Sequence, residues 1–255
     1  MGNTDFGLVS VIMAAYNAEN TIRQAIVSVL KQSYKNLELL VIDDCSLDST
    51  AEIVNNMAVR DGRIKLICHQ ENMGVSYSRR HGVEQAKGDW IAILDSDDRW
   101  VLNKLEKQIQ MQKVKNAELL FTGSAFIDEK GKGIRWHLHV PQEVGYKKLL
   151  KQNIISNSSV LVKKSLYKKF CVVNDDIHED FAVWLSITKS GRKAYSIDEP
   201  LLIYRLAKTS RSGNKLYSAR MNWNTYRYMG LNIGKACYYM AWYMVNGVLK
   251  YHNLR

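Results

Sequence analysis

Proline and cysteine are scarce in this chain, and no segment has a strongly biased composition. The 2 prolines among 255 residues exclude collagen-like and mucin-like chains, and the apolar content of 46% argues against global disorder. The 4 cysteines stand apart along the sequence, without a CxxC pair or histidines at zinc-ligand spacing. A disulfide framework or a zinc knuckle is therefore not expected, and a reducing compartment fits the chain best.

A secretory signal is also missing from the start of the chain. The opening residues, MGNTDFGLVS, lack the basic region of a signal peptide and carry no serine or threonine at the myristoylation position. The longest uncharged run, Ala236–Leu249, has 14 residues, whereas a helix that spans a bilayer needs about 20. We therefore expect a cytoplasmic protein without a membrane-spanning helix.

Acidic residues become rare in the second half of the chain. Residues 131–255 hold 21 Lys and Arg against 7 Asp and Glu, whereas residues 1–130 hold 15 against 18. From Leu201 to Arg255 there are nine basic residues and no acidic one. Such a basic half indicates an anionic partner, which could be nucleic acid, anionic lipid or a phosphorylated substrate; the alternative is an ordinary solvated surface.

The first part of the chain alternates short apolar runs with segments of helical period. The apolar runs are rich in Val, Ile and Leu, as strands buried on both faces are, and they occupy residues 8–15, 37–42, 64–68 and 90–94. Helices are predicted between them, at residues 21–32, 49–59 and 75–86. Ser49 and Glu52 predict a capping box at the start of the second helix. This order predicts an α/β fold with a doubly wound, mostly parallel sheet.

Polar side chains follow three of these strands. They are Tyr16 and Asn17 after the first, Asp43 and Asp44 after the second, and Asp95, Asp97 and Asp98 after the fourth. Ligands of doubly wound sheets bind at the carboxyl ends of the strands, where these side chains converge. Neither GxGxxG nor a P-loop motif follows the first strand, so a dinucleotide site is not supported. A DxD motif directly after a buried strand can instead hold Mn²⁺ or Mg²⁺ against a diphosphate.

Taken in order, these motifs resemble the inverting glycosyltransferases of family 2, which have the GT-A fold. The resemblance spans roughly residues 7–205 and rests on VSVIMAAYNAENTIRQAIVSVLKQSY, LELLVIDDCSLDST, NMGVSYSRRHGVEQAKGDWIAILDSDD and HEDFAVWLSI. It implies a Rossmann-like GT-A domain whose nucleotide-sugar half is residues 1–98 and whose acceptor and catalytic-base half is residues 99–205. Residues 206–255 would follow as a basic, aromatic helical extension.

The family's roles in donor binding fall on the first two strand ends and on the third helix. By this resemblance, Ala14 and Tyr16 would line the nucleotide base, with Tyr16 stacked on a uracil ring. Asp44 would accept a hydrogen bond from the base imide. Arg79 would lie near the base and the diphosphate, where its planar fork suits paired oxygens.

The family's metal and sugar contacts fall on the acidic motif and on a later basic segment. The resemblance implies that Asp95 reaches the ribose or the water shell of the metal, and that Asp97 binds Mn²⁺ or Mg²⁺ directly. Asp98 would approach the donor sugar or hold the loop. Arg205 and Ser210 would close over the diphosphate.

Glu179 and Asp180 open the helical run of residues 181–189. Asp180 resembles the family's base, which takes a proton from an acceptor hydroxyl as that oxygen attacks opposite the leaving diphosphate. Glu179 would orient Asp180 or bind an acceptor hydroxyl. The alternative is that these carboxylates only cap the helix. Trp184 would pack under a sugar or fill the core.

Tyrosine and tryptophan alternate with basic residues near the C-terminus. Tyr and Trp favour the depth of lipid headgroups, and basic residues are attracted to anionic lipid. A helix here would place Lys235, Asn246 and Lys250 on one side and leave a broad aromatic face. We expect this helix to dock the protein on the inner face of the cytoplasmic membrane; the alternative is a helix that packs its aromatic residues on the catalytic domain.

The resemblance implies transfer of a hexose, glucose or galactose, from a UDP-sugar to an acceptor such as GlcNAc-diphosphate-polyprenol, with a β-linked product in O-antigen or capsule synthesis. A nucleotidyltransferase that makes sugar nucleotides is one alternative, but such enzymes typically begin with a Gly-rich loop, absent after residues 9–15. A nucleic-acid-binding protein is another. No recognition motif supports it, and an acidic edge would repel phosphate without a metal, so nucleic acid is not an expected partner.

Overall fold

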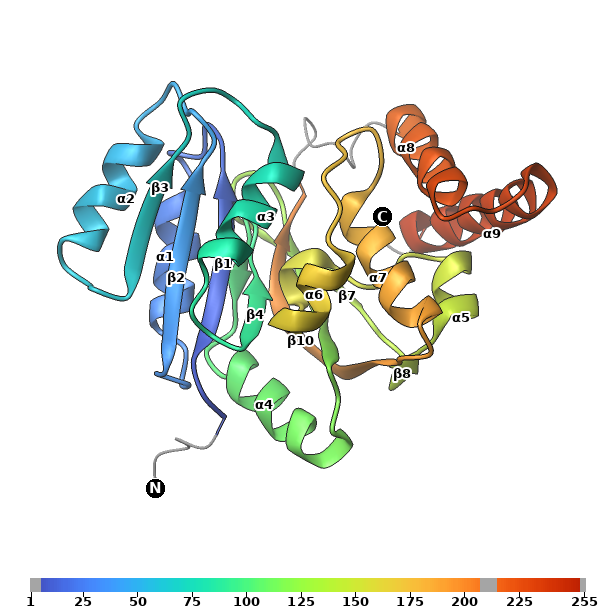
Figure 1. The fold of residues 1–255 in the computed structure, drawn as a ribbon, viewed down its shortest axis with the longest axis horizontal. Coiled ribbons are helices and arrows are strands. Elements are labelled where there is room, and N and C mark those ends of the chain that lie inside the picture. The colour runs from blue at the N-terminus through green and yellow to red at the C-terminus, as the bar shows by residue number, and fades with distance from the viewer. Residues whose placement is uncertain (1–5, 207–214, 253–255) are drawn as a thin grey trace.

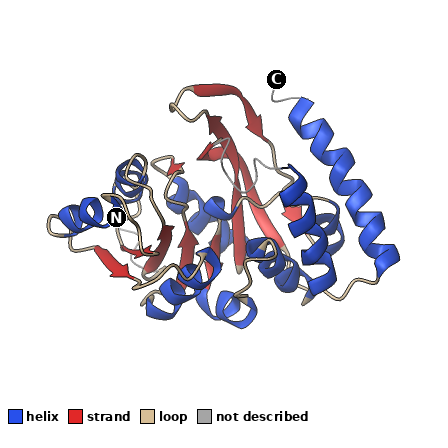
Figure 2. Ribbon diagram, turned by 90° about the horizontal axis from the view of Figure 1, so that it is seen from above, coloured by secondary structure: helices blue, strands red, loops and turns tan. Residues whose placement is uncertain are grey.

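Ten strands of the described chain form one sheet, which has helices on both of its faces (Figures 1 and 2). The computed structural model describes residues 6–206 and 215–252. The strands are β1 (Val9–Ala15), β2 (Leu37–Asp43), β3 (Ile64–Cys68), β4 (Trp90–Ile93), β5 (Arg99–Trp100), β6 (Leu119–Ile127), β7 (Gly133–Leu138), β8 (Glu143–Val144), β9 (Leu161–Lys163) and β10 (Ala194–Arg205). The helices are α1 (Ile22–Leu30), α2 (Thr50–Ala58), α3 (Val75–Gln85), α4 (Lys104–Lys115), α5 (Tyr146–Lys151), α6 (Lys164–Phe170), α7 (Glu179–Lys189), α8 (Lys215–Tyr228) and α9 (Ile233–His252), with the 3-10 turn η1 (Asn157–Ser159).

Side chains along each central strand alternate between two hydrophobic clusters, one on each face of the sheet. In β1, Ile12 joins the cluster that also contains residues of α3, α6 and α7, whereas Val11 and Met13 join the cluster with residues of α1, α2 and α4. In β4, Ile93 and Ala92 divide between the clusters in the same way. Because helices cover both faces, nearly every position of the central strands is apolar, which confirms the prediction of strands buried on both sides for β1, β2 and β4. The prediction is wrong for β3, which lies at the edge of the sheet and is only partly buried.

The order of the strands confirms the predicted parallel arrangement in the first half of the sheet. β3, β2, β1 and β4 lie side by side in that order and run parallel. The second half is mixed: β9 is antiparallel to β4 and β6, β10 is parallel to β6, and β5, β7 and β8 are antiparallel to their partners. One sheet therefore carries both predicted halves of the GT-A domain, and their boundary at residue 98 stays a prediction.

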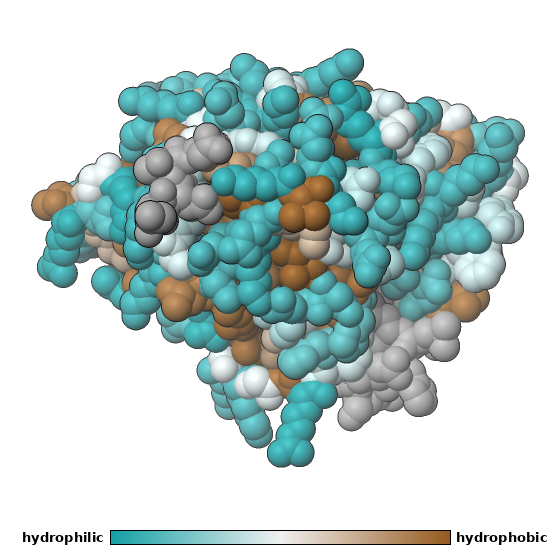
Figure 3. Space-filling model, turned by 90° about the horizontal axis from the view of Figure 1, so that it is seen from below, coloured by the Kyte–Doolittle hydropathy of each residue, from teal (hydrophilic) through white to brown (hydrophobic). Residues whose placement is uncertain are grey.

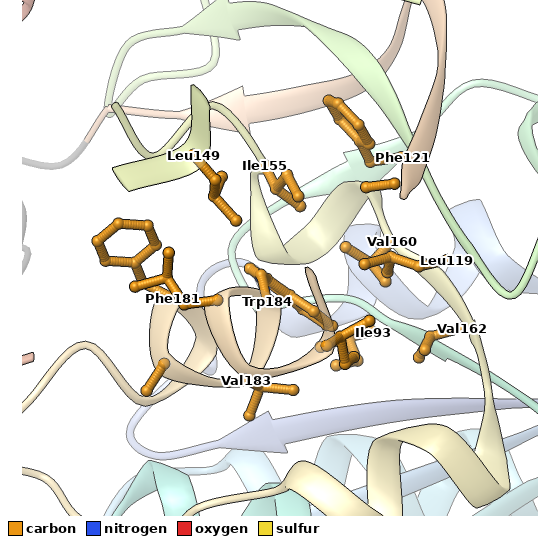
Figure 4. Packing of buried hydrophobic residues seen from close by; sticks show 14 of the residues in the cluster. Ile93, Leu119, Phe121, Leu149, Ile155, Val160, Val162, Phe181, Val183 and Trp184 are labelled. Carbon is orange, nitrogen blue, oxygen red and sulfur yellow. The ribbon is translucent and has the colours of Figure 1, made fainter. Parts of the chain in front are cut away.

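Trp184 lies in the core between α7 and the sheet. Its side chain has 0% exposure, and Figure 4 shows it surrounded by other members of one cluster, among them Ile93, Val160 and Phe181. Its indole nitrogen has no hydrogen-bond partner among the described residues. Of the two roles predicted for Trp184, the structure confirms core filling, because a ring enclosed in this way has no face left for a sugar.

The capping box predicted at the start of α2 is not formed. Ser49 is the N-cap residue, but its side chain makes no capping hydrogen bond. Asp48 satisfies the first turn instead, because its Oδ1 accepts a hydrogen bond from the Thr50 N–H at 2.9 Å and from the Thr50 hydroxyl at 2.5 Å. An aspartate that binds the backbone two residues ahead is a common local turn, and it takes the place of the predicted reciprocal pair.

The C-terminal helices α8 and α9 pack on α7 and α5 (Figure 1). Tyr226 of α8 is fully buried, and its hydroxyl donates to the Leu150 carbonyl at 2.7 Å. On α9, Ala236 is buried and Asn246 donates to the Lys151 carbonyl at 3.1 Å. Asn246 therefore faces the domain. The side chain of Lys250 lies outside the described residues.

The side of α9 that faces away from the domain is apolar. Tyr238 is 51% exposed, Met244 57% and Val245 52%, and no charged residue lies between Lys235 and Lys250. The helix thus packs on the domain through one side, as one of the predicted alternatives states, and presents a hydrophobic side to its surroundings. Docking of this side on a membrane stays a prediction. No helix in the described ranges is long and apolar enough to cross a bilayer. In the view of Figure 3 the surface is mostly hydrophilic, with small hydrophobic patches.

Candidate active site

The carboxyl ends of β1, β2 and β4 bring predicted donor-binding residues to one edge of the sheet. Parallel register sets the end of β1 beside the end of β2, so Tyr16 and Asp44 are neighbours along this edge. β4 flanks β1 on its other side, with a register that places Asp95 at the level of Ala14. Tyr16 is 49% exposed, which leaves its ring open to a stacking partner.

Asp44 is buried, and its carboxylate holds the loop between β3 and α3. Its Oδ1 accepts a hydrogen bond from the Met73 N–H at 2.9 Å and its Oδ2 from the Gly74 N–H at 2.8 Å. His69 Nδ1 lies 2.8 Å from Oδ1, and His69 Nε2 lies 2.9 Å from Nδ1 of His81. A nucleotide base would share this carboxylate with the loop, so the contact of Asp44 with the base imide stays a prediction.

Gly74 permits a close contact between the donor side of the site and the segment that precedes α7. Its φ is +86°, and a Cβ at this position would lie 1.8 Å from Oδ2 of Asp175. Oδ1 of Asp175 is 3.3 Å from the Ser76 N–H, from which it accepts a hydrogen bond. Only glycine combines the left-handed conformation with this close approach. The loop before α7 is therefore fixed against the first turn of α3.

The acidic loop after β4 crowds three carboxyl groups together. Asp98 is 1% exposed and accepts a hydrogen bond from the Arg205 N–H at 2.9 Å. Within the described residues, no partner reaches Oδ2 of Asp98. Burial and the neighbouring carboxylates raise the pKa of Asp98 well above its ordinary value. Burial, assisted by the charge of Asp95, raises the pKa of Asp97 to about 6. Burial is thus the main reason that both carboxyls resist ionisation, and their mutual proximity adds to it.

Arg205, at the end of β10, connects the acidic loop to the turn between β6 and β7 through hydrogen bonds. Its Nε donates to the Asp97 carbonyl at 3.1 Å, and its Nη1 donates to the carbonyls of Asp128 at 3.3 Å and Glu129 at 3.0 Å. The side chain is buried. These bonds give Arg205 a role within the protein, and its predicted contact with the donor diphosphate stays a prediction. Ser210 lies outside the described residues.

Arg79 of α3 bridges the two predicted groups of carboxylates. Its Nη1 donates to Oε1 of Glu179, and its Nη2 donates to Oδ1 of Asp95 at 2.5 Å. With the Asn157 amide oxygen facing the guanidinium, that oxygen also accepts from Nε at 3.2 Å and Nη2 at 3.0 Å. Burial disfavours the cation, but Asp95 and Glu179 outweigh it and raise the pKa of Arg79. Carboxylates of the protein thus bind the guanidinium of Arg79. The predicted contact of Arg79 with the nucleotide base and the diphosphate stays a prediction.

Glu179 and Asp180 begin α7, and the surroundings make both carboxyls more basic than usual. Burial raises the pKa of each, and the Arg79 guanidinium opposes that rise. Oδ1 of Asp180 also accepts a hydrogen bond from the Phe181 N–H at 2.7 Å, so part of the predicted helix capping is present. The half-buried carboxyl of Asp180, with its raised pKa, suits a general base, and one bond to the helix does not exclude that role.

The oxygen donors of the acidic loop fit a hard divalent cation. Within the described residues, no three or more Asp, Glu, His or Cys side chains are placed together as a ready metal site. Mg²⁺ and Mn²⁺ need few protein carboxylates when substrate phosphates and water complete the coordination. Burial disfavours the ionised form of Asp97, which a bound cation would favour, and Oδ2 of Asp98 has no hydrogen-bond partner among the described residues. Asp97 and Asp98 therefore suit a cation that is bound jointly with a substrate.

Several residues that shape the site carry no motif that sequence reasoning could use. Ser158 Oγ accepts a hydrogen bond from the Asp95 N–H at 3.1 Å, and its neighbour Asn157 contacts Arg79. His69 and Asp175 hold the loops on either side of Gly74. The available signal was a polar run, Ser156–Ser159, directly before the apolar residues of β9. These residues reach the site because β9, which follows them, lies between β4 and β6 in the sheet.

Comparison with known families agrees with this geometry. The model of the family described as "Glycosyl transferase family 2" matches residues 10–171, more than half of the chain. Two relatives from Escherichia coli carry the description "UDP-Glc:alpha-D-GlcNAc-diphosphoundecaprenol beta-1,3-glucosyltransferase". WfgD is 37% identical over 96% of this chain and 95% of its own length, and WfaP is 33% identical over 96% and 95%, respectively.

Solved structures share the fold. S. aureus TarS 1-349 in complex with UDP-GlcNAc superposes with a TM-score of 0.73 at 19% identity, over 92% of this chain and 71% of that chain. The mannosyltransferase PcManGT from Pyrobaculum calidifontis, in complex with GDP-Man and Mn²⁺, superposes with a TM-score of 0.69 at 17% identity, over 87% and 63%. These likenesses show the GT-A fold. Together with the family match and the E. coli relatives, they establish that this chain belongs to glycosyl transferase family 2.

Proposed function

We propose that this glycosyltransferase inverts the anomeric centre and moves a hexose, glucose or galactose, from a UDP-sugar to a sugar linked through diphosphate to a polyprenol. The observation that carries the proposal is the Arg79 bridge, because it joins the acidic loop after β4 to the carboxylates that open α7. A donor and an acceptor bound at this edge would meet between the two groups. The names of the two E. coli relatives specify UDP-Glc and a GlcNAc-diphosphoundecaprenol, which supports this donor and acceptor class.

The nucleotide of the donor would bind at the ends of β1 and β2. The exposed ring of Tyr16 offers a stacking surface for uracil beside Ala14, and Asp44 offers an acceptor for the base imide. Asp95, at the same edge, would bind the ribose or the water shell of the cation. Asp98 would hold the loop through its bond to the Arg205 N–H, which keeps the neighbouring residues turned toward the diphosphate.

Asp97 would hold Mn²⁺ or Mg²⁺ against the diphosphate of the donor. Burial and the charge of Asp95 raise the pKa of its carboxyl, so a nearby positive charge would favour the ionised form. A bound cation supplies that charge and stabilises the negative charge of the departing UDP. The Mn²⁺ complex of PcManGT, which shares the GT-A fold, supports the use of a divalent cation.

Asp180 would take the proton from the acceptor hydroxyl. Its side chain is half-buried, its pKa is raised, and Arg79 and Asp95 both act on its charge, so it belongs to the same electrostatic cluster as the acidic loop. Glu179, held by Arg79, would orient Asp180 or bind an acceptor hydroxyl. Attack on the anomeric carbon opposite UDP would convert an α-linked donor into a β-glycoside of O-antigen or capsule repeat units.

Substitutions at the two carboxylates separate their roles. Asp97→Ala and Asp180→Asn should each abolish hexose transfer, but only Asp97→Ala should weaken Mn²⁺-dependent UDP binding, measured by titration calorimetry. Asp89→Asn is a matched control, because Asp89 is exposed at the opposite end of β4. Near-normal turnover by Asp180→Asn would contradict its assignment as the base.

A panel of donors tests substrate class and stereochemistry together. The protein with Mn²⁺ should transfer hexose from UDP-Glc or UDP-Gal to a synthetic GlcNAc-diphosphate-lipid, and the product should show a β-linked anomeric signal by NMR. An α-linked product would refute inversion, and transfer from GDP-Man alone would refute the UDP donor. No observation on the structure favours the nucleotidyltransferase or the nucleic-acid-binding alternative.

The exposed side of α9 would place the enzyme on the inner face of the cytoplasmic membrane, where a polyprenol-linked acceptor resides. This surface consists of Tyr238, Met244 and Val245 with their exposed neighbours Ala241 and Trp242. The absence of acidic residues from Leu201 to Arg255 gives this part of the chain the charge that anionic phospholipid attracts. An apolar helix side beside basic residues is typical of helices that lie in the membrane interface.

Vesicle binding tests this docking directly. The full chain should sediment with vesicles of phosphatidylglycerol and phosphatidylethanolamine, and Met244→Glu/Val245→Glu should reduce the bound fraction several-fold. Val59→Glu is the control, because Val59 is 81% exposed on the remote α2–β3 connection. Equal sedimentation of all three proteins would refute docking through α9, and dimerisation lost in the double variant would indicate a second copy as the occupant of this surface.

A further inference from the structure

The hairpin of β6 and β7 begins next to the acidic loop. The turn between the strands is closed by hydrogen bonds from the Asp128 N–H to the Lys132 carbonyl at 2.9 Å and from the Gly131 N–H to the Asp128 carbonyl at 3.0 Å. Arg205 donates to the carbonyls of Asp128 and Asp97, so one guanidinium spans the gap between the turn and the acidic loop. β7 therefore starts beside the proposed reaction centre and leads away from it.

The described residues on β7 line a groove. β7 pairs with β6 on one side, and no other described strand pairs with it. Its side chains alternate: Arg135 and His137 are exposed, whereas Ile134 and Trp136 are half-buried and pack on the core. The Trp136 ring lies 5.0 Å from that of Phe126. The groove has a volume of about 830 Å³, and its described lining is Gly133, Ile134, Arg135, Trp136, His137 and His139.

The polar side chains of this groove are basic, and two of the three form no side-chain hydrogen bond or ion pair with the described residues. Among the described residues, neither Arg135 nor His137 has a side-chain hydrogen bond or ion pair, whereas His139 Nδ1 lies 3.2 Å from Asp198 Oδ2. Exposure alternates along β7, so Arg135 and His137 are both on its exposed side, and the pairing of β7 with β6 is irregular between Ile134 and His137. An arginine fork binds paired phosphate oxygens, and an imidazole N–H adds a further donor.

We propose that the groove along β7 binds the diphosphate of the acceptor through Arg135 and His137. The inference rests on the proposed function, because it assigns a place to the diphosphate that joins the acceptor sugar to its lipid. The acceptor sugar lies at the acidic loop and Asp180, and its diphosphate extends along β7. Trp136, half-buried and part of the groove lining beside Arg135, offers the apolar contact that a sugar ring or the first lipid carbons need.

The position of the groove favours the acceptor over the donor as its ligand. The donor's base and diphosphate are assigned to the ends of β1, β2 and β4, and β7 lies beyond β9 and β6 in the sheet. A diphosphate on β7 is therefore separate from the one held at Asp97. The groove is also open, as required for a ligand whose lipid must remain in a membrane.

Two acceptors that differ only in the diphosphate test the assignment. One is GlcNAc-diphosphate on a short alkyl chain, and the other is the same alkyl chain joined directly to GlcNAc. With UDP-Glc or UDP-Gal as donor, Arg135→Ala should raise the KM for the first acceptor by about 10- to 100-fold, the range for loss of a hydrogen bond to a charged group. The KM for the second acceptor and for the donor should stay unchanged, so the preference for the diphosphate should shrink accordingly.

Three further proteins make the outcome decisive. Arg135→Lys keeps the charge without the fork and should fall between Arg135→Ala and the unaltered protein. His137→Ala should show a smaller loss with the same acceptor selectivity. Arg60→Ala removes another exposed arginine, far from the groove on the α2–β3 connection, and should change neither acceptor.

The possible failures are distinguishable. An unchanged preference for the diphosphate in Arg135→Ala and His137→Ala would overturn the groove assignment while the unaltered protein still transfers hexose. Transfer to neither acceptor by the unaltered protein, with UDP binding intact, would overturn the proposed acceptor class and the groove assignment with it. An equal loss with both acceptors would show that Arg135 supports the fold and does not bind the diphosphate.

Discussion

Arg79 and Lys104 are both buried cations, and the protein treats their charges in opposite ways. Arg79 is 8% exposed and pairs with the carboxylates of Asp95 and Glu179. Lys104 is 0% exposed, and its Nζ donates to the Gln108 amide oxygen at 2.8 Å, above the ring of Trp100. No ion pair to Lys104 is present in the part of the chain that the structure describes.

This difference shows when the burial of a charged side chain indicates a functional site in this fold. A buried charge is costly unless an opposite charge compensates it. Compensation raises the pKa of Arg79 against the effect of burial, whereas burial alone lowers the pKa of Lys104 well below its ordinary value. Burial therefore marks the active site only where it coincides with a charge network. Lys104 is a structural residue under the sheet, and Arg79 holds the carboxylates that we assign to catalysis.

Removing the compensated cation should have the largest effect. Arg79→Met leaves Glu179 buried without its partner and releases Asp95, so we expect a loss of about 3–5 kcal/mol in the free energy of unfolding. Transfer should fall by roughly 100-fold or more, because small displacements of catalytic groups are costly. Urea unfolding and initial rates with a UDP-sugar measure the two effects.

The conservative substitution Arg79→Lys sharpens this prediction. Lysine keeps the charge but cannot contact two carboxylates and an amide through one planar fork. We therefore expect Arg79→Lys to retain more stability than Arg79→Met while transfer stays low. A fully active Arg79→Lys protein would show that charge alone is sufficient and that the bridging geometry is not needed.

A double substitution should separate stability from activity with a smaller effect. Glu179→Gln in the Arg79→Met background removes the uncompensated carboxylate. The loss in the free energy of unfolding should be smaller in the double variant than the sum of the losses in the two single variants, by about 0.5–3 kcal/mol. Transfer should not recover, because the group that orients Asp180 is still missing. Strict additivity of the two substitutions in stability would contradict the ion pair.

Much of the donor side of the site was predictable from the sequence, because it depends on local order. Strands buried on both faces leave an apolar run, and parallel strands bring their carboxyl ends together, so Tyr16, Asp44 and Asp95 could be placed at one edge. The structure confirms this placement. What each residue would contact in a substrate follows from the family resemblance and stays a prediction.

The partners within the protein were not predictable, because they depend on contacts distant in sequence. Arg79 and Glu179 are 100 residues apart, and no periodicity pairs them. β9 has three residues and runs antiparallel between β4 and β6, so neither its existence nor its place could be derived from an apolar pattern. Lys104 lies in a helix of low hydrophobicity, where a lysine is normally expected to face water.

Substitution of Lys104, the buried cation that has no carboxylate partner among the described residues, should have the smallest effect. This effect should appear as a change in how the free energy of unfolding depends on pH. The unfolded chain keeps the Lys104 proton up to about pH 10.5, whereas the buried amine releases it at lower pH. Between the two pKa values the unfolded state binds more protons, so the free energy of unfolding rises with pH, by at most about 1.4 kcal/mol per pH unit. Lys104→Met removes this contribution.

The difference in unfolding free energy between the unaltered protein and Lys104→Met should therefore change with pH, in favour of the unaltered protein as pH rises toward 10. Urea unfolding between pH 7 and 10 measures this difference, and other titrating groups cancel because both proteins share them. Lys115→Met is the control, because Lys115 is exposed on the same helix and should leave the pH dependence unchanged. If Lys104→Met and the unaltered protein showed parallel pH dependences, Lys104 would be protonated in the folded state. Burial without a carboxylate partner would then not be enough to discharge a cation in this fold, and the contrast with Arg79 would lose its physical basis.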